Sequence, residues 1–124
     1  MLSKTLKYLV FFWTIVIIVV CSIPGKEIPQ TPFINIPHFD KIVHAGLYFV
    51  LSLFSVRSFK QLSLIVLRQH PYMSSVIYAI LLGVFVEIIQ HYYIPNRAGE
   101  VLDALANTVG SILAVSILFF KEKN

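Results

Sequence analysis

The sequence has a single cysteine, Cys21, and few charged residues, and each shortage excludes a class of protein. One cysteine cannot form a disulfide within the chain, so a small disulfide-stabilised scaffold is excluded. Charged residues make up 13% of the 124 residues, whereas roughly 25% is typical of a soluble domain. The chain also lacks an HExxH sequence, a P-loop and a nucleophile elbow, so no local motif indicates an enzyme class.

Hydrophobic residues are in excess instead, at 57% of the chain. A small soluble domain cannot bury that much apolar surface in one core, so lipid must cover the rest. A helix that crosses the hydrocarbon core needs about 20 mainly apolar residues, and the apolar runs do not alternate with polar residues as barrel strands do. We therefore predict an all-α bundle of four transmembrane helices, which lies in the lipid bilayer as one domain over residues 1–124. The helices are expected at residues 6–23, 39–56, 73–94 and 101–120.

The first apolar segment has a second interpretation, because Lys4 and Lys7 precede it as charges precede the apolar run of a signal peptide. The residues around Cys21 are far from an A-x-A cleavage sequence. The other three segments also need a partner to shield their polar faces. We therefore expect the first segment to be retained as a membrane anchor.

The lysines and arginines are distributed unevenly between the two sides of the predicted membrane. Seven of the ten fall on the side of the two termini, and only Lys26, Lys41 and Arg97 fall on the other. Positive residues favour the cytoplasmic side, so we expect both termini in the cytoplasm and the protein in the inner (cytoplasmic) membrane. The net charge of +4 is scattered between apolar runs, and we therefore expect no nucleic-acid partner.

Residues 60–70 connect the second and third predicted helices on the cytoplasmic side. Their apolar run, residues 62–67, is too short to cross a bilayer. We expect this run either to lie at the cytoplasmic interface or to extend the second helix.

Several polar residues lie in or beside the predicted membrane helices, and the orientation above places all of them toward the outside. An ionisable group inside a bilayer costs at least ~2.5–3.5 kcal/mol on insertion scales, so such groups are rare and usually functional. Counting along the helices puts three of them roughly 5–8 Å from the midplane, so three helices are expected to direct polar groups into one chamber. The residues are Asp40, His44, Glu87, Gln90, Arg97, Asp103 and Asn107.

Most of these residues also have a purely structural interpretation. A carboxylate at a helix start is a common N-cap, which describes Asp40 and Asp103. Amide side chains often join helices inside membranes, which describes Asn107 and Gln90. His44 can be a core histidine whose hydrogen bonds are satisfied within the bundle. Lys41 and Arg97 can be anchors at the membrane interface.

Glu87 fits the structural interpretation least. It lies deep in the third predicted helix among apolar neighbours, where no capping role is open to it. We expect it to be protonated, paired with Arg97 or His44, or open to water. Gly83 and Gly110 supply small faces that allow helices to approach closely, and we assign the glycines no role beyond packing.

The order of these residues resembles the VanZ-like family, which is named for a teicoplanin-resistance membrane protein. The resemblance runs from the second predicted helix to the end of the chain and has two mild departures, at Glu100 and Ala114. It implies a small multi-pass inner-membrane protein, in the founding case linked to glycopeptide resistance, and it implies no particular reaction. The pattern is Asp40-Lys41-x-x-His44 with Tyr48 one turn on, then Glu87-x-x-Gln90, Arg97, Asp103, Asn107 and Gly110.

Three functions are compatible with the sequence. The first is binding or protection of a cell-envelope lipid or lipid-linked precursor, with Lys41 and Arg97 facing a phosphate or carboxylate. The second is an intramembrane hydrolase or transferase acting on a lipid phosphate or ester. The third, a small transporter or flippase subunit, requires alternating access, for which the sequence offers no internal repeat.

The roles assigned to the residues follow from these hypotheses, and the sequence leaves open whether the protein is an enzyme. The candidate catalytic residues are His44 as general acid or base, Glu87 as its carboxylate partner, and Asp103. A metal held by His44, Glu87, His91 and Asp103 is an alternative, but these residues come from different helices. We therefore assign no metal and no cofactor. The candidate ligand-binding residues are Asp40, Lys41, Gln90, Arg97 and Asn107.

Overall fold

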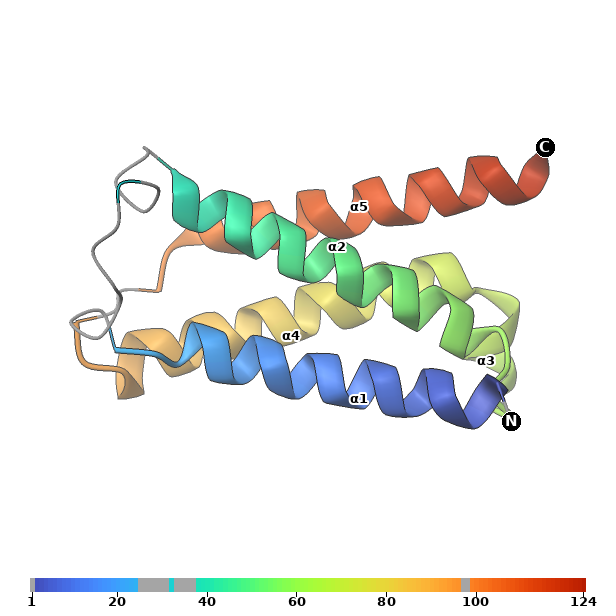
Figure 1. Cartoon of the computed structure of the whole chain (residues 1–124), viewed down its shortest axis with the longest axis horizontal. Coiled ribbons are helices and arrows are strands. Elements are labelled where there is room, and N and C mark those ends of the chain that lie inside the picture. Colours follow the sequence, from blue (N-terminus) through green and yellow to red (C-terminus); the bar gives the residue numbers. More distant parts are fainter. Residues whose placement is uncertain (1, 25–31, 33–37, 97–98) are drawn as a thin grey trace.

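The computed structural model describes residues 2–24, 32, 38–96 and 99–124 of the chain. Within these residues the regular secondary structure is entirely helical, which confirms the predicted all-α class. Four of the helices are long and apolar enough to cross a membrane. Figure 1 shows them side by side along the long axis of the molecule, with both termini at the same end. The helices are α1 (Leu2–Cys21), α2 (Phe39–Phe59), α3 (Ile65–Gln69), α4 (Pro71–Tyr93) and α5 (Val101–Lys123).

The long helices match the predicted segments in number and order, but their ends differ by a few residues. The helical backbone of α2 continues through Arg57, and that of α5 continues to Lys123. Apolar runs measure the stretch that lipid can cover, whereas lysine and arginine are good helix formers that extend the backbone beyond it. Pro71 opens α4, where its missing N–H costs nothing.

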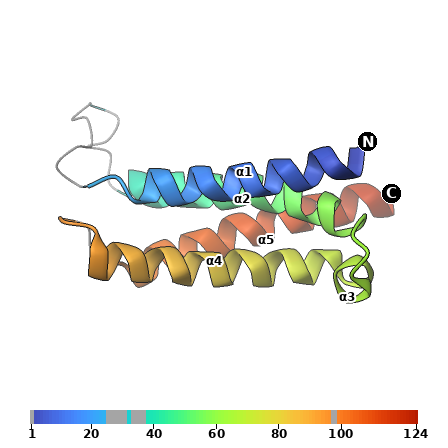
Figure 2. The same cartoon turned by 90° about the horizontal axis from the view of Figure 1, so that it is seen from below.

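The connection between α2 and α4 is a separate short helix rather than an extension of α2. Helix α2 ends at Phe59, and α3 follows as an independent element (Figure 2). The extension alternative is therefore wrong. Leu64, Ile65 and Val66 are 64%, 55% and 65% exposed, which favours the alternative position against the membrane interface.

The tightest packing joins α2 to α5 at Gly110. A side-chain carbon on Gly110 would lie 2.0 Å from the carbonyl oxygen of Ala45, so no larger residue fits without separating the helices. A side-chain carbon on Gly83 of α4 would lie 3.0 Å from Nδ2 of Asn107. These close approaches are the packing role expected of the glycines, and they bring three helices together near one end of the bundle.

Buried serines join the helices farther along the bundle. The hydroxyls of Ser52 and Ser111 lie 2.7 Å apart, and those of Ser55 and Ser75 lie 2.6 Å apart. Lipid is as apolar as a protein core, so close packing and such hydrogen bonds hold membrane helices together. Sequence analysis did not single out these serines, because serine is common in membrane helices and its partner cannot be read from its own helix.

Helix α1 is part of the same bundle. The indole N–H of Trp13 donates a hydrogen bond to the carbonyl of Leu47 at 2.9 Å, and the hydroxyls of Thr14 and Tyr78 lie 2.6 Å apart. Ile17 is completely buried. These contacts favour the interpretation of the first segment as an anchor that shields the other helices.

A small charged cluster lies at the end of the bundle that holds the termini. Lys60 donates a hydrogen bond to the hydroxyl of Tyr72 at 3.0 Å, and Glu122 accepts hydrogen bonds from both residues. Partial burial disfavours the charged form of Lys60, but these hydrogen bonds outweigh it and raise its pKa above the ordinary value. Each charge in this cluster therefore has a partner.

Candidate functional site

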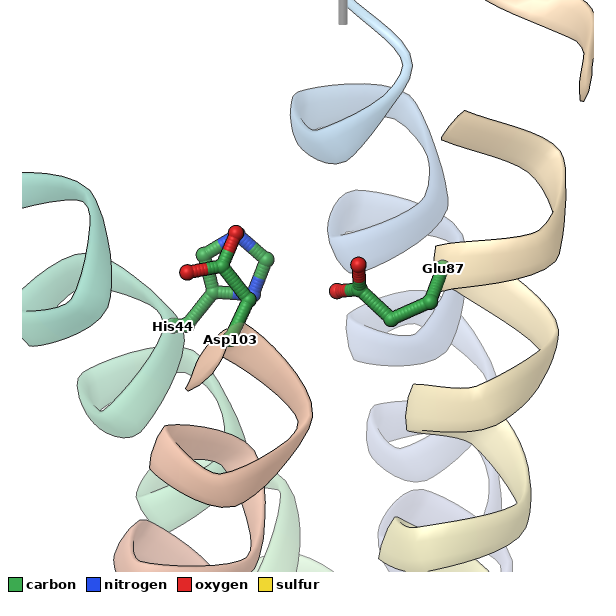
Figure 3. Close-up of side chains that lie close together, drawn as sticks. All are labelled: His44, Glu87 and Asp103. Atoms are coloured by element: carbon green, nitrogen blue, oxygen red, sulfur yellow. The ribbon is translucent and has the colours of Figure 1, made fainter. Parts of the chain in front are cut away.

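Three helices bring His44, Glu87 and Asp103 together at the end of the bundle opposite the termini. His44 comes from α2, Glu87 from α4 and Asp103 from α5 (Figure 3). One ligand atom from each side chain lies within 4.8 Å of the other two. His44 is 3% exposed and Asp103 is 5% exposed. The convergence expected from counting along the helices is thus present in the structure.

Asn107 determines the orientation of the His44 ring. The Nδ1 atom of His44 lies 3.0 Å from the side-chain oxygen of Asn107. An amide oxygen can only accept, so Nδ1 carries the hydrogen and donates it. The other ring nitrogen, Nε2, faces Asp103 at 3.8 Å, which is too long for a hydrogen bond. In the neutral ring, the lone pair of Nε2 therefore faces a carboxylate without bonding to it.

Lys41 pairs with three acidic residues at the outer edge of the site. Its ammonium lies 3.0 Å from Asp103, 2.8 Å from Asp40 and 2.8 Å from Glu100. An ammonium has three N–H donors, and these three carboxylates accept all of them. Lys41 is therefore the counter-ion of Asp103. Its N–H donors are already used by these carboxylates, so it is poorly suited to bind an external anion.

The N-cap position expected for Asp40 and Asp103 is wrong, although both carboxylates lie in the first helical turn, where they suit the positive helix end. The N-cap residues are His38 for α2 and Glu100 for α5, and neither helix start has a side-chain cap hydrogen bond. Both aspartates lie inside the first helical turn and contact Lys41 instead. For both aspartates, the hydrogen bond with the ammonium of Lys41 outweighs the preference for capping a helix. A charge-assisted hydrogen bond is stronger than a neutral one.

Glu87 makes a structural contact that could not be predicted from its own helix. Its Oε2 atom accepts the backbone N–H of Glu100 at 2.8 Å, just before α5 begins. The loop can approach α4 because residue 99 is glycine, where a side-chain carbon would lie 2.6 Å from the carbonyl oxygen of Glu87. Glu87 therefore ties α4 to the start of α5, and its carboxylate points toward His44 and Asp103 (Figure 3).

Three further candidates lie apart from this cluster or outside the described residues. The amide nitrogen of Gln90 donates to the carbonyl oxygen of Cys21 at 2.9 Å and so joins α4 to the end of α1. His91 is exposed and packs its ring on Tyr92. It does not belong to the group of metal-ligating side chains formed by His44, Glu87 and Asp103. Arg97 lies outside the described residues, so its role stays a prediction.

Tyr48 is a site residue to which the sequence analysis assigned no role. It lies one turn from His44 on α2 and is completely buried. Among the described residues its hydroxyl has no hydrogen-bond partner. A buried hydroxyl without a partner costs about 1–3 kcal/mol. In the sequence, only its spacing of one helical turn from His44 pointed to Tyr48. The sequence around a tyrosine does not show whether its hydroxyl has a hydrogen-bond partner.

A cleft of about 260 Å³ opens between α4 and α5 beside Glu87. Its walls are mainly apolar, and several wall residues lie on the outer face of the bundle, with Val84 48%, Ile88 49% and Val101 78% exposed. Because membrane lipid surrounds the outer face of a spanning helix, we expect the cleft to face lipid. The lining residues are Val84, Glu87, Ile88, His91, Tyr92, Gly99, Glu100, Val101 and Ala104.

A family model described as VanZ/LLP1 matches residues 2–122, which is nearly the whole chain. The chain belongs to the VanZ/LLP1 family. The match confirms the resemblance seen in the sequence and extends it to α1. No curated protein and no solved structure matches the chain. Together with the four apolar helices, the family assignment identifies a multi-pass membrane protein.

Proposed function

We propose that this VanZ/LLP1 protein binds a lipid, or a lipid-linked precursor, of the cell envelope in the outer half of the cytoplasmic membrane. One observation carries the proposal: an apolar cleft, which we expect to face lipid, leads to Glu87, which lies beside His44 and Asp103. An amphiphilic molecule has the matching form, with an apolar chain for the cleft and a polar headgroup for the cluster. A solute without a hydrocarbon chain would have no apolar group to pack against the walls of the cleft.

The charges of the site indicate the kind of headgroup. The described residues around the cluster include four carboxylates, and the single positive charge of Lys41 is shared among three of them, so negative charge remains in excess. A headgroup that donates hydrogen bonds, through hydroxyl or ammonium groups, therefore suits these residues better than a bare anion. Recognition of a phosphate on the same headgroup would fall to Arg97, as the sequence predicts.

An intramembrane hydrolase or transferase is the second candidate, and the position of His44 favours it. Asn107 holds one ring nitrogen at 3.0 Å, the other nitrogen faces Asp103, and Glu87 belongs to the same group of side chains. A histidine with a defined tautomer beside carboxylates is the arrangement expected of a general acid or base. In this case the bound lipid is also the substrate. A link to teicoplanin resistance rests on the family resemblance alone.

The first test compares Glu87→Gln with Glu122→Gln in full-length protein purified in mild detergent. Each variant removes one carboxylate, but at opposite ends of the bundle. Glutamine at position 87 keeps an oxygen to accept the N–H of Glu100, so the start of α5 is retained. Mass spectrometry of the co-purified lipids should show one class retained by wild type and Glu122→Gln, and reduced about tenfold in Glu87→Gln.

Incubation with a panel of envelope lipids separates the two candidates. Product formed by wild type and absent in Glu87→Gln supports the enzyme, whereas retained lipid without product supports binding. If wild type neither retains nor converts any lipid of the panel, the proposal is wrong.

A second pair of variants tests the cleft itself. Ala104 lines the cleft, whereas its neighbour Leu105 is 55% exposed and does not line it. Phenylalanine at position 104 should fill the apolar space and reduce co-purified lipid about tenfold. A tenfold loss of affinity requires only that a few methylene groups of the lipid chain are no longer buried. Leu105→Phe should leave lipid retention unchanged. Equal retention in both variants would show that the chain of the lipid does not enter this cleft.

A further inference from the structure

Two groups of side chains in the described residues have the composition of a cation site, and they lie next to each other. The outer group consists of Asp40, Glu100 and Asp103, and the inner group consists of His44, Glu87 and Asp103. The outer group already surrounds a cation, because the ammonium of Lys41 lies within 3.0 Å of all three carboxylates. The inner group combines an imidazole with two carboxylates and lies deeper.

The spacing of the inner group is compatible with ligation of one metal ion. The 3.8 Å between Nε2 of His44 and Oδ2 of Asp103 is too long for a hydrogen bond. It is a suitable separation for two atoms that bind one ion, since each would lie about 2.0–2.2 Å from it. The mutual limit of 4.8 Å among all three atoms leaves only small side-chain adjustments to complete the coordination.

The residues around the inner group independently support this assignment. A metal-binding histidine almost always donates its other ring N–H to an oxygen, which fixes the tautomer and directs the free nitrogen to the metal. Asn107 accepts that N–H from His44, and its side chain is 1% exposed, so this contact is buried inside the bundle. The hydroxyl of Tyr48, one turn from His44 on α2, is buried without a described partner. It can bond a coordinated carboxylate or water.

We infer that His44, Glu87 and Asp103 bind one divalent transition-metal ion, of the zinc or manganese type. An imidazole with two carboxylates suits these ions better than it suits Mg²⁺ or Ca²⁺, which prefer oxygen ligands alone. Three protein ligands leave a coordination position open, as in catalytic rather than structural metal sites. Of the three ligands, Glu87 also lines the apolar cleft, so an ion held here would lie beside the place proposed for a lipid headgroup. The inference goes beyond lipid binding, because metal binding is measured without lipid.

The test is a metal titration of the full-length protein in mild detergent, after removal of bound metal with a chelator. Wild type is titrated with Co²⁺, whose visible absorption reports coordination, and Zn²⁺ is then added in competition. We expect one equivalent of Co²⁺ per chain and its displacement by Zn²⁺. If folded wild type, with helical circular dichroism and a single elution peak, binds no stoichiometric Co²⁺ or Zn²⁺, the inference is overturned, whatever lipid the protein retains.

Matched variants locate the ion. His44→Ala and Asp103→Asn should weaken Co²⁺ binding at least about 100-fold, and Asn107→Ala about 10–100-fold. His91→Ala removes an exposed histidine of the same helix bundle, and Asp40→Asn removes a carboxylate of the outer group; both should change the affinity less than about threefold. Equal losses in His91→Ala or Asp40→Asn would place the ion elsewhere and overturn the assignment. The absorption spectrum of wild type gives a readout that does not depend on whether a variant folds.

Discussion

The two halves of the bundle use polar side chains in opposite ways. In the half that holds the termini, polar groups form closed pairs, as Ser55 does with Ser75 and Lys60 does with Glu122. At the other end, carboxylates outnumber the described cations, and Tyr48 and Asn107 each have a buried atom without a described partner. Closed pairs stabilise helix contacts and offer nothing to a ligand. The surplus of hydrogen-bonding and charged groups at the other end is what indicates a site.

This difference also bears on the transport hypothesis. A path through the membrane would require polar groups that a solute can reach in both halves. The described serines in the half that holds the termini include Ser55 and Ser75, which bond each other. Their hydroxyls are completely buried. The observed pairing therefore favours a one-sided site over a transport path.

The largest effect is expected from separating the helices that build the site. Gly110→Val would place side-chain atoms on the carbonyl of Ala45, where only 2.0 Å is available. We expect loss of the folded bundle in detergent, measured by size-exclusion chromatography and circular dichroism. Gly46→Ala is the control, because nothing lies within 4 Å of the added carbon, and it should be neutral or slightly stabilising. A stable Gly110→Val bundle would contradict the α2–α5 contact described above.

Removing one lysine from each end gives the most direct comparison of the two halves. Lys41→Met leaves the carboxylate of Asp103, with a side chain 7% exposed, without its counter-ion, and should cost about 3–5 kcal/mol. Lys60→Met removes a cation whose side chain is 33% exposed, and should cost less than about 1 kcal/mol because solvent screens the pair. Reversible unfolding in detergent mixtures measures both values. Equal losses would mean that the two ends do not differ in the way proposed.

The smallest effect is expected from the serine pairs. Ser52→Ala and Ser111→Ala should each reduce the free energy of unfolding by about 0.6 kcal/mol, the average found for hydrogen bonds between membrane helices. The double variant should lose little more than either single variant, because both remove the same bond. A double-mutant cycle measures this coupling. Additive losses would show that the two hydroxyls act independently.

The correspondence between expectation and structure is closest for properties that depend on hydrophobicity alone. The four spans were predicted to within a few residues. A run of apolar side chains is a local property, and it alone determines whether a segment is stable in lipid. The polar residues of the site were found for the same reason, since a charge within such a run is conspicuous. The N-cap position expected for Asp40 and Asp103 was wrong, because that expectation considered only the helix on which each residue lies.

The sequence by itself determined that this is a four-span membrane protein with its unusual charges gathered toward one end. Only the tertiary structure decided what those charges contact. Lys41 meets Asp103 across 62 positions, and Glu87 meets the backbone of Glu100 across 13 positions. Helical periodicity is a local property, whereas such contacts depend on how α2, α4 and α5 pack. The close approach at Gly110 fixes that packing, and with it the meeting of imidazole and carboxylates.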